Sequence, residues 1–191
     1  MQNSSHRMVS GHGTPVLKNE NVNHLAPIAA QQWYLEYAQH QLAFACGQLP
    51  AASQALYVLA RIYTVLDNTQ LETQMLCLPQ AVALHQAALA VDPRNGRAAN
   101  ELGVLLVRCG QLEDARQVFL HSISVLPAPE TWHNLSVVQE RMGQMEMARR
   151  AAEQSAAVAA QRSEQSPDVP VQSVHWVDPK TFSTVRSAPE P

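Results

Sequence analysis

The chain has 191 residues, which suits one modest domain with tails. Its net charge of −3 does not indicate a nucleic-acid-binding protein, and no apolar run approaches the ~18 residues of a membrane-spanning helix. Hydrophobic residues make up 46% of the chain and aromatic residues only 5%, while 27 Ala and 19 Gln far outnumber 7 Gly. Because Ala and Gln favour helices and Gly does not, the composition predicts an all-α protein with an aliphatic core.

The composition divides the chain into three zones. Residues 1–31 are polar and show no periodicity, so we expect a flexible, disordered N-terminal arm. Residues 32–162 show the periodicity of helices. Residues 163–191 are rich in Pro and Ser, so we expect a disordered tail, which carries an aromatic motif at 174–182.

One short sequence recurs along the helical zone. The segment 46–52, Cys-Gly-Gln-Leu-Pro-Ala-Ala, returns as Cys-Gly-Gln-Leu-Glu-Asp-Ala at 109–115 and as Met-Gly-Gln-Met-Glu-Met-Ala at 142–148. A weaker copy lies at 76–81, and the four copies are spaced 29, 34 and 33 residues apart. The nearly equal spacing of one turn predicts stacked copies of a single helical unit.

The copy around Gly110 shows how each unit is built. Before this glycine, apolar residues fall on one helix stripe, namely Ala98, Leu102, Leu105, Leu106 and Cys109. Gly110 is suited to end that helix with a positive φ, and a second stripe then runs to Pro127. We therefore predict a helix, a tight turn and an antiparallel helix, a hairpin that must stack on its neighbours to bury both faces.

These residues resemble the tetratricopeptide repeat, a helical hairpin of about 34 residues. The third unit carries the fullest set of matching residues: Ala99, Leu102, Gly103, Leu106, Gly110, Ala115, Phe119, Ser122 and Pro127. The fourth unit carries Trp132, Leu135, Ser136, Gly143, Ala148, Ala152 and Ser155. The resemblance implies a right-handed superhelix of about four antiparallel hairpins over residues 32–162, with units at about 33–62, 63–95, 96–128 and 129–162.

The same resemblance implies a concave groove, lined by the first helix of each unit, that holds a peptide or helix of a partner protein. It implies as groove residues Tyr34, Tyr37, Gln41, Phe44, Arg97, Asn100, Val104, Arg108, His133, Val137, Glu140 and Arg141. The three arginines are suited to bidentate binding of a carboxylate. The alternative is that all of these are ordinary solvated residues. The repeats contain no Lys, so the lysine clamp that some family members use on a peptide C-terminus is not expected.

The sequence shows no arrangement that predicts catalysis. The cysteines Cys46, Cys77 and Cys109 are not spaced as zinc ligands are, and the eight His include no HExxH and no i, i+4 pair. No Gly-rich phosphate loop is present. We therefore expect no enzyme activity, no cofactor and no metal. We also expect no nucleic-acid partner, no insertion into a membrane, and reduced thiols in the cytoplasm.

The last predicted helix, at about 145–162, presents a broad surface of alanines at an end of the array where a polar cap is usual. Three interpretations of the aromatic motif that follows remain open. Trp176 and Phe182 fold back to cap this surface, in the same chain or on a second protomer. Otherwise the motif is a short linear segment for another protein, or the tail is disordered and its Trp has no partner.

The function most consistent with these features is that of a non-catalytic protein-protein interaction module, acting as an adaptor, scaffold or assembly factor. Two alternatives remain. In one, the repeats self-associate through the alanine-rich last helix into a structural homo-oligomer capped by its own tail. In the other, the chain is a regulatory subunit of an enzyme or secretion complex.

Overall fold

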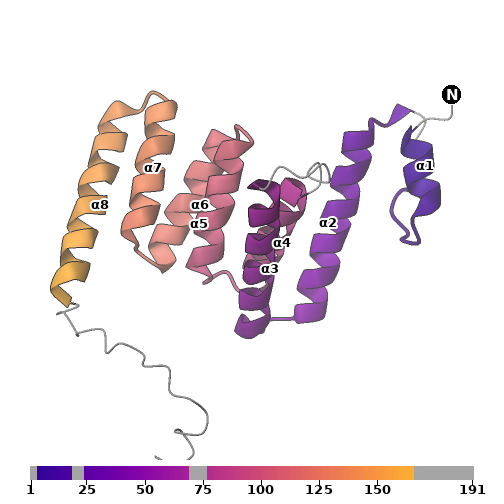
Figure 1. Ribbon diagram of the computed structural model, residues 1–191, viewed down its shortest axis with the longest axis horizontal. Coiled ribbons are helices and arrows are strands. Elements are labelled where there is room, and N and C mark those ends of the chain that lie inside the picture. Colours follow the sequence, from indigo (N-terminus) through magenta and orange to yellow (C-terminus); the bar gives the residue numbers. More distant parts are fainter. Residues whose placement is uncertain (1–3, 19–23, 69–76, 166–191) are drawn as a thin grey trace, which may run out of the picture. The chain divides into compact units, whose positions relative to one another are not determined.

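The computed structural model describes residues 4–18, 24–68 and 77–165. All regular structure within these ranges is helical, which confirms the all-α prediction. The packing discussed below lies in the unit that ends at Ala159, and residues 160–165 complete the last helix. The helices are α1 Ser4–Gly11, α2 Pro27–Cys46, α3 Pro50–Asn68, α4 Cys77–Val91, α5 Gly96–Arg108, α6 Leu112–Val125, α7 Pro129–Arg141 and α8 Met145–Gln165 (Figure 1).

Three antiparallel hairpins follow one another along the chain, formed by α3 with α4, α5 with α6, and α7 with α8 (Figure 1). Ser122 of α6 donates a hydrogen bond to the Gly96 carbonyl at the start of α5, at 2.7 Å. Ser155 of α8 donates the same bond to the Pro129 carbonyl of α7, at 2.8 Å. A serine ten or eleven positions into each second helix thus ties it to the start of the first. Neighbouring hairpins stack through α4 on α5 and α6 on α7.

The first hairpin is tied by the reverse bond. Ser53 near the start of α3 donates to the Ala88 carbonyl near the end of α4, at 2.8 Å. Ser53 therefore holds the position in its hairpin that Gly96 holds in the next, because each lies at the start of the first helix and contacts the end region of the second.

The turns inside the last two hairpins have the backbone that their glycines predict. Gly110 and Gly143 both have φ of 76°, a region that favours glycine. The Gln111 N–H donates to the Leu106 carbonyl at 2.9 Å, which closes the six-residue ring of a Schellman motif, and the same pattern recurs at Gly143. The predicted helix stops are confirmed at both places.

The core of α5 to α8 is built around one aromatic side chain. Phe119 of α6 is buried and belongs to a cluster with Leu102, Leu135 and Val138 of α5 and α7. Its ring lies over Gly103, where an added Cβ would stand 2.5 Å from the nearest ring carbon. The glycine therefore allows α5 and α6 to approach closely enough to enclose the ring.

The segment 1–31 differs from the flexible arm that we expected. Helix α1 and the start of α2 lie within it. Val9, Leu17 and Ala30 form a small buried cluster that joins this segment to α2. The sequence did not predict this cluster, because the apolar residues of the segment are too sparse to produce a periodic pattern.

Helix α3 crosses the boundary that we expected between the first and second units. It runs through residues 62 and 63 and pairs with α4. Leu56, Tyr57 and Ala60 are buried, and Tyr63 packs against the same cluster. The apolar stripe therefore continues across the expected boundary, so nothing in the chain ends the helix there.

Alanines and charged side chains share the outer surface of α8. Ala151 is buried in the core, while Ala152, Ala156 and Ala157 are exposed. The aromatic motif at 174–182, with Trp176 and Phe182, lies outside the described residues.

We predict that Gly103→Ala destabilises the protein by about 1–3 kcal/mol, because the new methyl group must displace the Phe119 ring. Urea unfolding followed by circular dichroism measures the loss. Gly13→Ala is the matched control, since its Cβ would meet no atom within 4 Å. Equal stability of the two variants would contradict the proposed close packing at Gly103.

Candidate functional site

Helix α5 has two sides of different character. Leu102 and Leu106 are buried in the core. The residues expected in the groove recur on the other side at i, i+3, i+7 and i+11: Arg97 and Arg108 are exposed, and Asn100 and Val104 are half-buried. Two residues along a helix turn it by about 200°, so the Val104 side is roughly opposite the Leu102 side.

Helix α7 presents a matching row beside α5. The residues expected from the fourth unit are all exposed on it: His133, Val137, Glu140 and Arg141. The two helices pack on each other, and Asn134 Nδ2 donates to Asn100 Oδ1 at 3.0 Å. We refer to these four residues and the four of α5 as the α5–α7 face.

The residues expected from the first unit lie on α2, which packs on α1 and α4. Tyr34 is half-buried, its hydroxyl donates to the Val16 carbonyl at 3.3 Å, and its ring stacks on His12 with centroids 4.3 Å apart. The others lie at the surface of α2, half-buried or exposed: Tyr37, Gln41 and Phe44. The structure thus brings together the residues of the third and fourth units, while Tyr34 joins α2 to the N-terminal segment.

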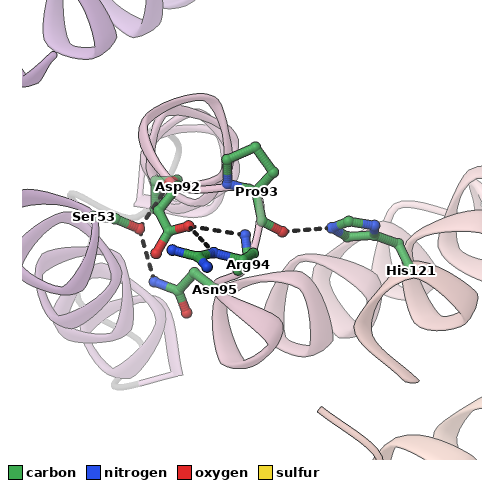
Figure 2. Close-up of polar contacts among 7 residues, drawn as sticks. Ser53, Asp92, Pro93, Arg94, Asn95 and His121 are labelled. Carbon is green, nitrogen blue, oxygen red and sulfur yellow. Dashed lines mark hydrogen bonds and ion pairs between the residues drawn. The ribbon is translucent and has the colours of Figure 1, made fainter. Parts of the chain in front are cut away.

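A polar network that we did not predict joins α3, α4 and α5 (Figure 2). Asn95 caps α5, since its Oδ1 accepts from the Ala98 N–H at 3.0 Å. The Asn95 amide donates to Ser53 Oγ at 2.9 Å, and Ser53 donates to the Ala88 carbonyl. An Asn directly before a helix was the available signal, because Asn is a preferred N-cap residue.

The same turn is also tied to α6 (Figure 2). His121 Nε2 forms a hydrogen bond with the Pro93 carbonyl at 2.7 Å, and Asp92 Oδ1 accepts from the Arg94 N–H at 3.0 Å. A small cavity of about 280 Å³ lies here and is bordered by Arg97. One end of the α5–α7 face therefore rests on a turn held by three helices.

His85 of α4 occupies the place in its hairpin that Phe119 has in the next. It lies three residues before Ala88, as Phe119 lies three residues before Ser122, and these are the residues that tie each hairpin. His85 is 0% exposed, and neither ring nitrogen has a hydrogen-bond partner among the described residues. The nearest ring is that of Tyr57, with centroids 5.8 Å apart.

The burial of His85 changes its protonation. Desolvation, with a further contribution from the Arg61 guanidinium, lowers the pKa of His85 from its usual 6.5 to about 4. The folded protein therefore keeps the imidazole neutral at pH 7. A phenylalanine position filled by histidine places a titratable group in the core of the first hairpin.

The described residues offer no cluster of three or more His, Cys, Asp or Glu side chains that is placed to hold a metal ion. In the same part of the chain, no helix is both long and apolar enough to cross a membrane. Cys46, Cys77 and Cys109 are free thiols.

Comparison with known proteins finds a tetratricopeptide repeat in the middle of the chain. Residues 78–135 match the family model of the tetratricopeptide repeat. A crystal structure of MamA is similar, with a TM-score of 0.52, 17% identity, and coverage of 59% of this chain and 61% of that chain. A structure of a MamA mutant has a TM-score of 0.43 and 20% identity, and the match covers 65% of this chain and 96% of that chain. No curated protein matches. The match to the family model confirms, for residues 78–135, the resemblance to the tetratricopeptide repeat seen in the sequence.

We predict that Asn95→Ala lowers the free energy of unfolding by about 1–2 kcal/mol, because it removes the N-cap of α5 and the donor to Ser53. Urea unfolding gives the value. Gln54→Ala, an exposed change on the neighbouring helix, is the control and is expected to have little effect. A loss no larger than that of the control would argue against the network.

We predict that acid lowers the free energy of unfolding through the protonation of His85. The unfolded chain binds a proton below pH 6.5 and the folded chain only below about 4, so stability is complete above pH 6.5 and falls between these values. The full difference is about 3 kcal/mol. His85→Leu removes this dependence, and urea unfolding at several pH values measures it. An unchanged slope of stability against pH in the variant would refute the assignment.

Proposed function

We propose that this tetratricopeptide-repeat protein is a non-catalytic adaptor or scaffold that binds a peptide or helix of a partner protein along the α5–α7 face. The fold is that of protein-protein interaction modules in general, which supports the class of function. The observation that carries the proposal is the row of three arginines on two adjoining helices: Arg97, Arg108 and Arg141.

The chemistry of the face indicates what the partner presents. The three guanidinium groups outnumber two carboxylates, those of Glu140 and of Glu101, which lies one helical turn after Arg97, so the face favours an acidic segment or a free C-terminal carboxylate. Val104 and Val137 supply apolar surface between the charges. The free thiols support a reducing compartment, and we place the protein in the cytoplasm.

We predict that Arg97→Glu/Arg141→Glu loses the partner that the native chain captures from its host. Each charge-assisted hydrogen bond contributes about 1.5–3 kcal/mol, so the affinity for that partner falls by about tenfold or more. Affinity purification with mass spectrometry identifies the partner, and titration calorimetry then measures the loss.

The control is Arg149→Glu/Arg150→Glu, which makes the same change of charge on the exposed surface of α8. It is expected to retain the partner. Equal capture by all three baits would place the binding site elsewhere.

A second candidate function, self-assembly, is favoured by one observation on α3. Leu59 and Ile62 follow Ser53 at the same intervals as Leu102 and Leu105 follow Gly96. Their exposed fractions are 42% and 51%, against 4% and 1% for their counterparts. The side of α3 on which a preceding repeat would stack is therefore apolar and open.

Sedimentation over a concentration series distinguishes the two candidates. Growth in mass with concentration, unaffected by the arginine changes, favours self-assembly, in which the alanine surface of α8 is a further candidate contact. Recovery of a stoichiometric enzyme or secretion component would instead favour a regulatory subunit.

A further inference from the structure

A second surface lies outside the α5–α7 face. A cavity of about 890 Å³ runs between α2 on one side and α6 on the other, over α4 and α5. On α2 its residues recur with the spacing of a single helix stripe: Ile28, Gln31, Gln32, Leu35, Glu36 and Gln39. We refer to this cavity as the α2–α6 groove. At 1.5 Å per residue, the α2 stripe is about 16 Å long, or three helical turns.

The floor of the α2–α6 groove is largely apolar, with Gln86 of α4 as its amide. It is formed by side chains of the helices below the opening, among them Leu78, Val82, Leu102 and Leu106. Leu102 and Leu106 lie roughly opposite the Val104 side of α5. The groove and the α5–α7 face therefore use different sides of the same helix, and a ligand in one does not cover the other.

The walls of the groove carry carboxylates and amides. Glu36 of α2 and Asp114 of α6 are exposed on opposite walls, and neither is in an ion pair within the part of the chain that the structure describes. The lining contains no Lys, Arg or His. The two carboxylates therefore give the groove a negative rim, in contrast to the arginine-rich face on the other side of α5.

We propose that the α2–α6 groove binds a basic amphipathic helix of a partner protein. A helix suits the apolar floor because its backbone groups are paired within it, whereas an extended peptide would leave N–H and C=O groups unpaired there. Apolar residues at i, i+3, i+4 and i+7 of the partner lie on the floor. Lys or Arg side chains on its two flanks reach Glu36 and Asp114, which sets the preference for a cationic helix.

Two synthetic helical peptides test the proposal with the full-length chain. Both carry the same Leu stripe over four turns, one with Lys flanks and one with Glu flanks. Fluorescence anisotropy is expected to show saturable binding of the Lys peptide, with a Kd at least tenfold below that of the Glu peptide. Equal affinity for both peptides, or no saturable binding of the Lys peptide, would overturn the proposal.

Paired charge variants locate the binding. Glu36→Lys/Asp114→Lys is expected to lower the affinity for the Lys peptide at least tenfold and to raise the affinity for the Glu peptide. Glu146→Lys/Glu153→Lys makes the same change of net charge on α8 and is expected to bind as the native chain does. Equal losses in both variants would show general charge attraction and overturn the proposal. Thermal melts confirm that the variants are folded.

Two further measurements test whether the α2–α6 groove acts independently of the α5–α7 face and whether a second copy of the chain fills it. The Arg97→Glu/Arg141→Glu variant is expected to bind the Lys peptide unchanged, so the result is independent of the proposed function of the α5–α7 face. A dimer that is lost only in Glu36→Lys/Asp114→Lys would assign the groove to a second copy of the chain and overturn the proposal.

Discussion

The contact between Gly103 and the Phe119 ring is the constraint on which the packing of the last two hairpins depends. Because the glycine has no Cβ, α5 and α6 enclose the ring, which then meets α7 through Leu135 and Val138. This contact fixes the position of α5 relative to α6 and α7. The α5–α7 face and the floor of the α2–α6 groove are the two sides of the helix that it holds.

The first hairpin has different side chains at the positions that correspond to Gly103 and Phe119. Ala60 is buried in α3, and His85 fills the place of the phenylalanine. An imidazole is smaller than a phenyl ring and carries two polar nitrogens, which here find no partner among the described residues. Ser53 and Asn95 supply polar ties between this hairpin and the next. Serine hydrogen bonds tie the hairpins at both ends of the array, whereas a buried imidazole without a hydrogen-bond partner among the described residues is found in the first hairpin and not around Phe119.

The sequence predicted the features that depend on local pattern. The stops at Gly110 and Gly143 and the apolar stripe of α5 follow from glycine conformation and from the helical period, so they were predictable, whereas the residues of the opposite side of α5 were expected only from the family resemblance. The course of α3 was not, because its apolar stripe simply continues past the expected boundary. The packing of α2 on α4, and with it the groove, depends on contacts between distant segments that leave no periodic signal.

Repeat arrays distribute their stability among neighbouring units, so a weak unit affects mainly its own contacts. His85 makes the hairpin of α3 and α4 such a unit in acid. Protonation there would weaken the contacts of α3 and α4 first, since the buried residues of the Phe119 cluster include no titratable side chain. The groove that rests on α4 would therefore lose its support at a milder acidity than the face that rests on α7.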